Sequence, residues 1–179
     1  MNISLPKLKA ILKFFCQNTD PKILGKTKLM KLFYFLDFSH VKKYGVSVTG
    51  DTYYRLEHGP IPSVIKNLVD SLETESNWSL LYDTIEILKS DDDPKHIIKC
   101  KKNFTTKDED YFSPIELNTL KEVCARFSQY NAKQIVDMAH QEASWRKTQE
   151  MGHIPYALAA DDPDSQVSKE DIELMQKTL

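Results

Sequence analysis

Three histidines lie beside predicted turns or helix ends and are the first candidates for chemistry. His58 precedes a Gly-Pro turn, His140 lies towards the end of a predicted helix, and His153 lies in a turn that contains glycine and proline. Converging with Asp37 or Glu57, they would supply the donor types of a metal site or an acid–base pair. No ligand pair at short spacing supports such a site, and histidines near turns more often bond to backbone carbonyls. A small metal-dependent hydrolase is therefore the less favoured hypothesis.

Other signatures of chemistry are absent from the sequence. It contains no Gly-rich phosphate loop, no Cys-x-x-Cys, no His-Glu-x-x-His and no Gly-x-Ser-x-Gly. The aspartates at 91–93 lack the glycine and the later carboxylate of a calcium loop, which favours a solvated loop. Cys16, Cys100 and Cys124 have no metal-ligand spacing, and the first residues lack the apolar run of a signal peptide. We expect a cytoplasmic protein that is not an enzyme, with no catalytic residues, no metal and no cofactor.

The stretch 28–44 is predicted to form the central helix, against which the elements that carry the candidate side chains must pack. Its middle, Leu32 to Leu36, is five large apolar or aromatic residues in a row, which cover every side of a helix. The charged residues within and beside it argue against a membrane span, so a buried helix ending at Gly45 is expected. Lys31, Phe35 and Phe38 share one face, where the lysine either covers apolar surface with its stem or belongs to a binding face.

Shorter elements surround this central helix. Helix starts are predicted at Ser4, Ser63, Ser113 and Asn131, the last two with a capping residue three positions on. A hairpin is expected from 46–49 and 52–57, followed by a rigid turn at 58–62, where two prolines lack amide donors. A second hairpin, 84–88 with 96–100, would have an acidic tip at 90–94. The sequence predicts a mainly helical α+β fold, packed around one central buried helix with two small β-hairpins.

The chain is expected to divide into a globular domain, 1–160, and an appendage, 161–179, formed by an acidic linker and a short helix. Ile172, Met175 and Leu179 form an apolar stripe on that helix, which must find a groove on its own domain or on a partner. Aromatic and cationic residues are the types that anchor interfaces. The residues predicted to contact a partner are Lys31, Tyr34, Tyr53, Arg55, Ile172 and Met175.

Three motifs in this order resemble the Panacea, or SocA-like, antitoxin domain family. They are Thr-Lys-Leu-Met-Lys-Leu-Phe-Tyr-Phe-Leu at 27–36, His-Gly-Pro-Ile-Pro at 58–62, and His140 followed by Ser144-Trp145. The resemblance covers about residues 5–156. It pairs His58, Gly59 and Pro60 with the segment from His140 to Trp145 as a structural motif, so we expect these two irregular stretches to pack together.

The resemblance implies an antitoxin that neutralises a cognate protein toxin by direct binding, as part of a toxin–antitoxin system. Delivery of the toxin to a cytoplasmic protease is the alternative that it also implies. A phage-associated interaction domain without any toxin stays open as well. No membrane partner is expected.

We predict that the isolated chain does not bind duplex DNA appreciably at physiological salt. Its 24 Lys and Arg against 26 Asp and Glu give a formal net charge of −2, and no helix carries a basic cluster, so no broad positive field attracts phosphates. A gel-shift titration with its own promoter measures this. A sub-micromolar, salt-sensitive shift would contradict the prediction.

Overall fold

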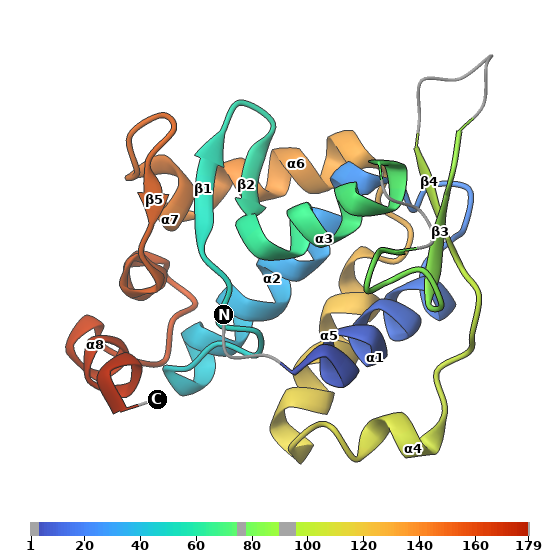
Figure 1. Ribbon diagram of the computed structural model, residues 1–179. Helices are drawn as coiled ribbons and strands as arrows, with labels where there is room; N and C mark the ends of the chain where they lie inside the picture. The colour runs from blue at the N-terminus through green and yellow to red at the C-terminus, as the bar shows by residue number, and fades with distance from the viewer. Residues whose placement is uncertain (1–3, 75–77, 90–95, 179) are drawn as a thin grey trace.

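The computed structural model describes residues 4–74, 78–89 and 96–178 of the 179-residue chain. Helices make up most of it, and two small antiparallel sheets complete the predicted α+β fold (Figure 1). The elements in chain order are α1 (Leu5–Gln17), α2 (Lys26–Tyr44), β1 (Tyr53–Leu56), β2 (Gly59–Pro62), α3 (Ser63–Thr74), β3 (Ile85–Leu88), β4 (Ile97–Cys100), α4 (Thr106–Glu109), α5 (Pro114–Phe127), α6 (Ala132–Gln141), α7 (Ala143–Arg146), β5 (His153–Ile154), the 3₁₀ helix η2 (Tyr156–Asp161) and α8 (Lys169–Thr178).

The predicted central helix is confirmed as α2. Every side chain from Lys28 to Phe38 is at most 3% exposed, so the helix is buried on all sides. It ends at Gly45, which adopts a φ of 77° that glycine tolerates and other residues rarely do. The described ranges contain no helix with both the length and the apolar composition needed to cross a bilayer.

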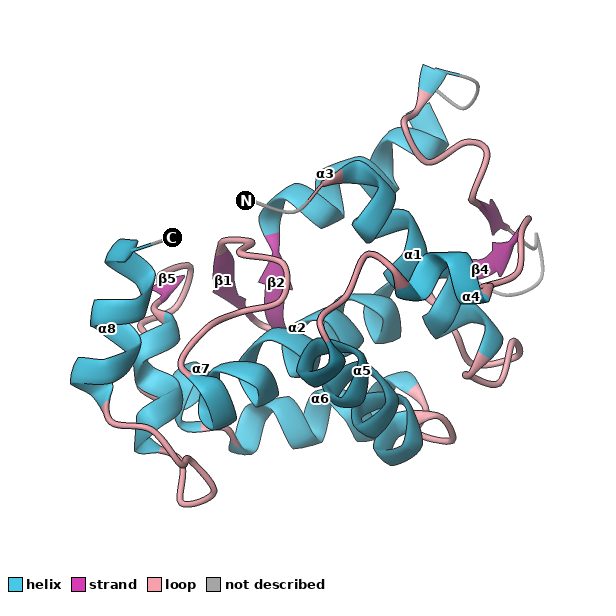
Figure 2. Cartoon of the chain, turned by 90° about the horizontal axis from the view of Figure 1, so that it is seen from below, coloured by secondary structure: helices cyan, strands magenta, loops and turns pink. Residues whose placement is uncertain are grey.

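The helices α5 and α6 lie directly against α2 (Figure 2). The strand β2 and the 3₁₀ helix η2 also pack on it, and α1 meets it through an aromatic pair. Aromatic rings supply much of the contact. Phe127 of α5 stacks on Phe35 with 4.3 Å between ring centroids, and Phe15 of α1 meets Phe33 edge to face at 5.2 Å. Such ring pairs are favourable geometries beyond the apolar area that they bury.

Local capping starts most helices where the sequence predicts. Ser113 and Asn131 each form a reciprocal capping box with the residue three positions on. The start of α3 differs from the prediction, because Ser63 is its first residue and the cap comes from Asp51. The Asp51 carboxylate accepts hydrogen bonds from the backbone N–H groups of Val64 (3.1 Å) and Ile65 (2.9 Å).

The partner strand predicted for the first hairpin, residues 46–49, is wrong. Residues 46–49 form no strand, because the N–H groups of Val48 and Thr49 donate to the Asp37 carboxylate instead of to a ladder. β1 pairs with β2, which contains the two prolines that argued for a turn, and with β5 on its other side. The sheet order β2-β1-β5 places β2 at an edge, where proline is tolerated.

The second hairpin is confirmed as β3 paired with β4. Its acidic tip, and with it the predicted solvated loop at 91–93, lies outside the described residues. β4 packs against α1, and the hairpin stands at the opposite end of the molecule from α8 (Figure 1).

The last helix docks on its own domain. α8 packs against η2, and Ile172 is fully buried there. The preceding segment is also held, since the Gln166 N–H donates to the Lys42 carbonyl at 2.7 Å. The division of the chain at residue 160 stays a prediction, but the helix after it is not an unattached arm.

We predict that Leu36→Ala lowers the free energy of unfolding by about 2 to 5 kcal/mol, because it opens a cavity in the fully buried α2. The midpoint of urea denaturation measures the change. Leu80→Ala is the matched control, since Leu80 is exposed and its loss leaves no cavity. Equal midpoints for Leu36→Ala and wild type would refute the importance of this packing.

Candidate functional site

Lys31 lies fully buried beneath the β1–β2 hairpin. Its Nζ donates a hydrogen bond to the Pro60 carbonyl at 2.9 Å. Gly59 makes room for it: with a φ of 90°, a Cβ at this position would lie 2.6 Å from Lys31 Cε. Burial away from water lowers the pKa of Lys31 to about 7. The lysine therefore fastens the hairpin to α2 rather than reaching solvent.

A layered contact joins the same hairpin to α6 and α7. The His140 ring stacks on Trp145 with 3.9 Å between centroids and 19° between planes, and the Arg55 guanidinium lies 4.2 Å from the Trp145 ring centre. Trp145 Nε1 donates to the Leu56 carbonyl at 3.3 Å. A Cβ at Gly59 would lie 3.5 Å from His140 Nε2. The predicted packing of the Gly-Pro segment near the segment from His140 to Trp145 is confirmed.

Lys31 and His140 are both biased towards their neutral forms. Burial first, and then the charge of Lys31, lower the pKa of His140. His140 Nε2 is buried and has no hydrogen-bond partner among the described residues. Because Lys31 is fully covered, a solute cannot reach it unless the hairpin moves. The arrangement is suited to holding the hairpin, α6 and α7 on α2.

A buried polar network around Asp37 was not predicted from the sequence. The carboxylate accepts hydrogen bonds from the N–H groups of Val48 (2.9 Å) and Thr49 (2.7 Å) and from the hydroxyls of Tyr53 (2.9 Å) and Tyr156 (3.1 Å). Burial raises its pKa to about 6, although these bonds oppose the shift. The available signal was an aspartate directly after five apolar residues of a buried helix, since such a group needs several donors.

The three histidines are not assembled into a metal centre. His58 is exposed in the turn of the β1–β2 hairpin, and His153 is exposed on β5 beside Tyr54. Asp37, which was considered as their partner, accepts bonds from threonine, tyrosine and backbone groups. Within residues 4–74, 78–89 and 96–178, no three His, Cys, Asp or Glu side chains are grouped as metal ligands.

Four of the six residues predicted to contact a partner are core residues instead: Lys31, Tyr34, Tyr53 and Ile172. The reason is that α2 is covered on every face, so the aromatic rings on it and against it are enclosed. The Tyr34 hydroxyl, for example, shares a buried hydrogen bond with Ser144 Oγ at 2.5 Å. Arg55 is half-buried over Trp145, and Met175 is 45% exposed on α8.

Three exposed large apolar side chains lie elsewhere, in the connection from α3 to β3. Trp78 is 88% exposed, and Leu80 and Tyr82 are more than half exposed. Trp and Tyr are enriched among the residues that carry binding energy in interfaces. The sequence signal was an isolated tryptophan in a polar loop, which we did not include among the contact residues.

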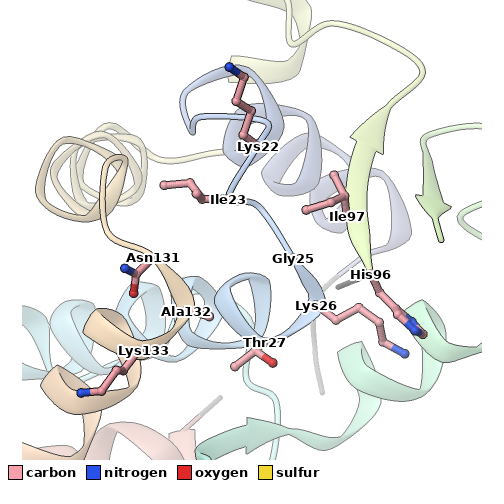
Figure 3. A pocket seen from close by; sticks show the side chains of 10 residues that line it. All are labelled: Lys22, Ile23, Gly25, Lys26, Thr27, His96, Ile97, Asn131, Ala132 and Lys133. Atoms are coloured by element: carbon pink, nitrogen blue, oxygen red, sulfur yellow. The ribbon is translucent and has the colours of Figure 1, made fainter. Parts of the chain in front are cut away.

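A groove lies where the starts of α2 and α6 meet β4 (Figure 3). We call it the α2–β4–α6 groove. It has a volume of about 680 Å³. Its floor is apolar and its rim carries lysines, as the lining residues show: Lys22, Ile23, Gly25, Lys26, Thr27, His96, Ile97, Asn131, Ala132 and Lys133.

Comparison with protein families identifies the scaffold. The model for the antitoxin SocA-like Panacea domain matches residues 29–146, about two thirds of the chain. The chain belongs to this family. The Panacea match runs from α2 to α7, so it includes Lys31, Gly59, Pro60, His140 and Trp145. Comparisons with curated proteins and with solved structures found no match.

We predict that wild-type stability rises relative to Lys31→Met between pH 7 and pH 10. The pKa of Lys31 is about 7 in the folded Panacea domain and about 10.4 for an exposed lysine, so the unfolded chain binds more protons between these values. Raising the pH through this window therefore favours the folded wild type, with a slope of up to about 1.4 kcal/mol per pH unit.

Urea denaturation of wild type and Lys31→Met across this pH range measures the difference, in which the titration of Asp37 cancels. Lys133→Met is the control, because Lys133 is an exposed lysine and its removal leaves the pH dependence unchanged. Parallel stability curves for wild type and Lys31→Met would contradict the prediction.

Proposed function

We propose that this chain is the antitoxin of a toxin–antitoxin pair and that it neutralises a cognate protein toxin by stoichiometric binding. The observation that carries the proposal is the match to the SocA-like Panacea antitoxin family over residues 29–146. An antitoxin family implies a protein partner. The function proposed here needs a shaped surface and no chemistry of its own, so we further propose that the chain is not an enzyme.

Two features of the surface support a protein partner. The loop with Trp78, Leu80 and Tyr82 presents large apolar side chains to solvent, and the α2–β4–α6 groove combines an apolar floor with a charged rim. Both border the β3–β4 hairpin, because the loop leads into β3 and Ile97 of β4 lines the groove. Interfaces are commonly built from aromatic anchors surrounded by polar residues.

The cellular location of the toxin–antitoxin pair and the position of its genes are part of the same proposal. The described cysteines are free thiols, which is usual for a cytoplasmic protein. We propose a cytoplasmic toxin encoded next to this chain, in a genome or in a phage. Delivery to a protease is a mechanistic alternative, and stoichiometry separates it from masking.

We predict that co-expression of the chain with the product of the neighbouring reading frame restores growth that this product alone arrests. Purified together, the two proteins should form a complex of fixed stoichiometry, and neutralisation in vitro should saturate when that stoichiometry is reached. Size-exclusion chromatography with light scattering measures the complex. Leu36→Ala serves as a control with impaired folding.

Three results would speak against direct masking. Growth arrest that persists with equal amounts of folded antitoxin would reject the proposed pairing. Neutralisation by substoichiometric amounts would indicate turnover, by an enzyme or by a protease adaptor. Neutralisation that disappears in a host lacking its cytoplasmic ATP-dependent proteases would identify the adaptor.

A further inference from the structure

We propose that the α2–β4–α6 groove is the docking site for an acidic segment of the protein partner. An apolar side chain of that segment would sit between Ile23 and Ile97, and its carboxylates would meet the lysines of the rim. This inference rests on the proposed function, because the partner is the toxin that the chain is proposed to neutralise.

The groove is built on a fixed backbone. The segment before α2 is bonded to β4 and to the residue before it: Lys26 N–H donates to the His96 carbonyl at 3.1 Å, and Ile98 N–H donates to the Leu24 carbonyl at 2.8 Å. These bonds hold Ile23 and Ile97 on the two sides of the floor (Figure 3). A site that exists before binding avoids the entropic cost of ordering it.

The rim is positive. Lys22, Lys26 and Lys133 lie on three sides of the groove, and no aspartate or glutamate is among its lining residues (Figure 3). α2 and α6 both begin here, and the start of a helix carries a partial positive charge. Within residues 4–74, 78–89 and 96–178, no side chain caps α2, and the backbone N–H of Lys26 at its start donates to the His96 carbonyl.

The three lysines differ in whether they already form ion pairs within the chain. Lys26 forms ion pairs with Asp70 and Glu73, which tie α2 to α3. Lys133 pairs with Asp137, but both side chains are exposed, and such a pair is weak in water. Lys22 has no ion pair with any described residue. Lys22 and Lys133 are therefore the charges available to a partner.

The lining favours a peptide over a nucleic acid. Ile23, Ile97 and Ala132 offer an apolar floor, which matches an apolar side chain and has no counterpart in a phosphate backbone. The whole chain has a net charge of −2, so the positive rim is a local feature. Local charge of this kind steers one complementary protein segment and sets the rate of association.

The test uses the full chain and the purified product of the neighbouring reading frame, with affinity measured by isothermal titration calorimetry. We expect Lys22→Glu/Lys133→Glu to weaken binding about tenfold or more and to flatten its dependence on salt. The control Lys107→Glu/Lys121→Glu carries the same change in charge on exposed lysines of α4 and α5, outside the groove. It should bind as wild type does.

A second pair of variants tests the apolar floor without changing charge. Ala132→Trp should fill the groove and weaken binding by a similar factor, whereas Ala132→Ser leaves the space open. Melting temperatures equal to that of wild type confirm folding. Glutamate at position 133 is compatible with the first turn of α6, because negative side chains are favourable there.

The outcomes separate the groove from the proposed function. Tight wild-type binding with unchanged affinity in Lys22→Glu/Lys133→Glu and in Ala132→Trp would overturn the docking site and leave the antitoxin function intact. Failure of wild type to bind or neutralise would overturn both. Binding of a labelled 20-nucleotide single strand that Lys22→Glu/Lys133→Glu abolishes would assign the groove to nucleic acid and reject the peptide.

Discussion

The burial of α2 on every side is the constraint on which the rest of the structure depends. A helix in this position has no solvent face, so each of its polar side chains needs a partner in a neighbouring element. Lys28 donates to the Ser128 carbonyl just after α5, and His40 shares a hydrogen bond with a threonine of α5. Lys31 reaches β2, and Lys42 pairs with Glu142 before α7. Apolar packing holds the layers together, and these directional bonds set where each element lies.

The proposed docking groove lies partly outside the segment that the family model matches. The family match starts on α2 and ends in α7, so it spans the elements that these buried polar contacts join. The groove draws Lys22 to Thr27 from the chain before that match, and its other lining residues from within it.

Local signals in the sequence predicted the elements better than their roles. Capping residues at Ser113 and Asn131 and the apolar run of α2 depend on neighbours along the chain, and the structure has them as predicted. β2 was missed because an edge position, which tolerates proline, is a property of the whole sheet. Lys31 was assigned to a surface because its burial depends on a hairpin about thirty residues later. The groove was not predicted either, because its lining residues come from three separate segments of the chain.

The close approach of Lys31 and Gly59 has an evolutionary consequence. The lysine stem occupies the space that a side chain at position 59 would need, and the positive φ excludes most other residues there. Glycine at position 59 and a long, slim side chain at position 31 therefore depend on each other. In related chains the two positions should change together or not at all, and a shorter residue at 31 would leave the hairpin without its fastening to α2.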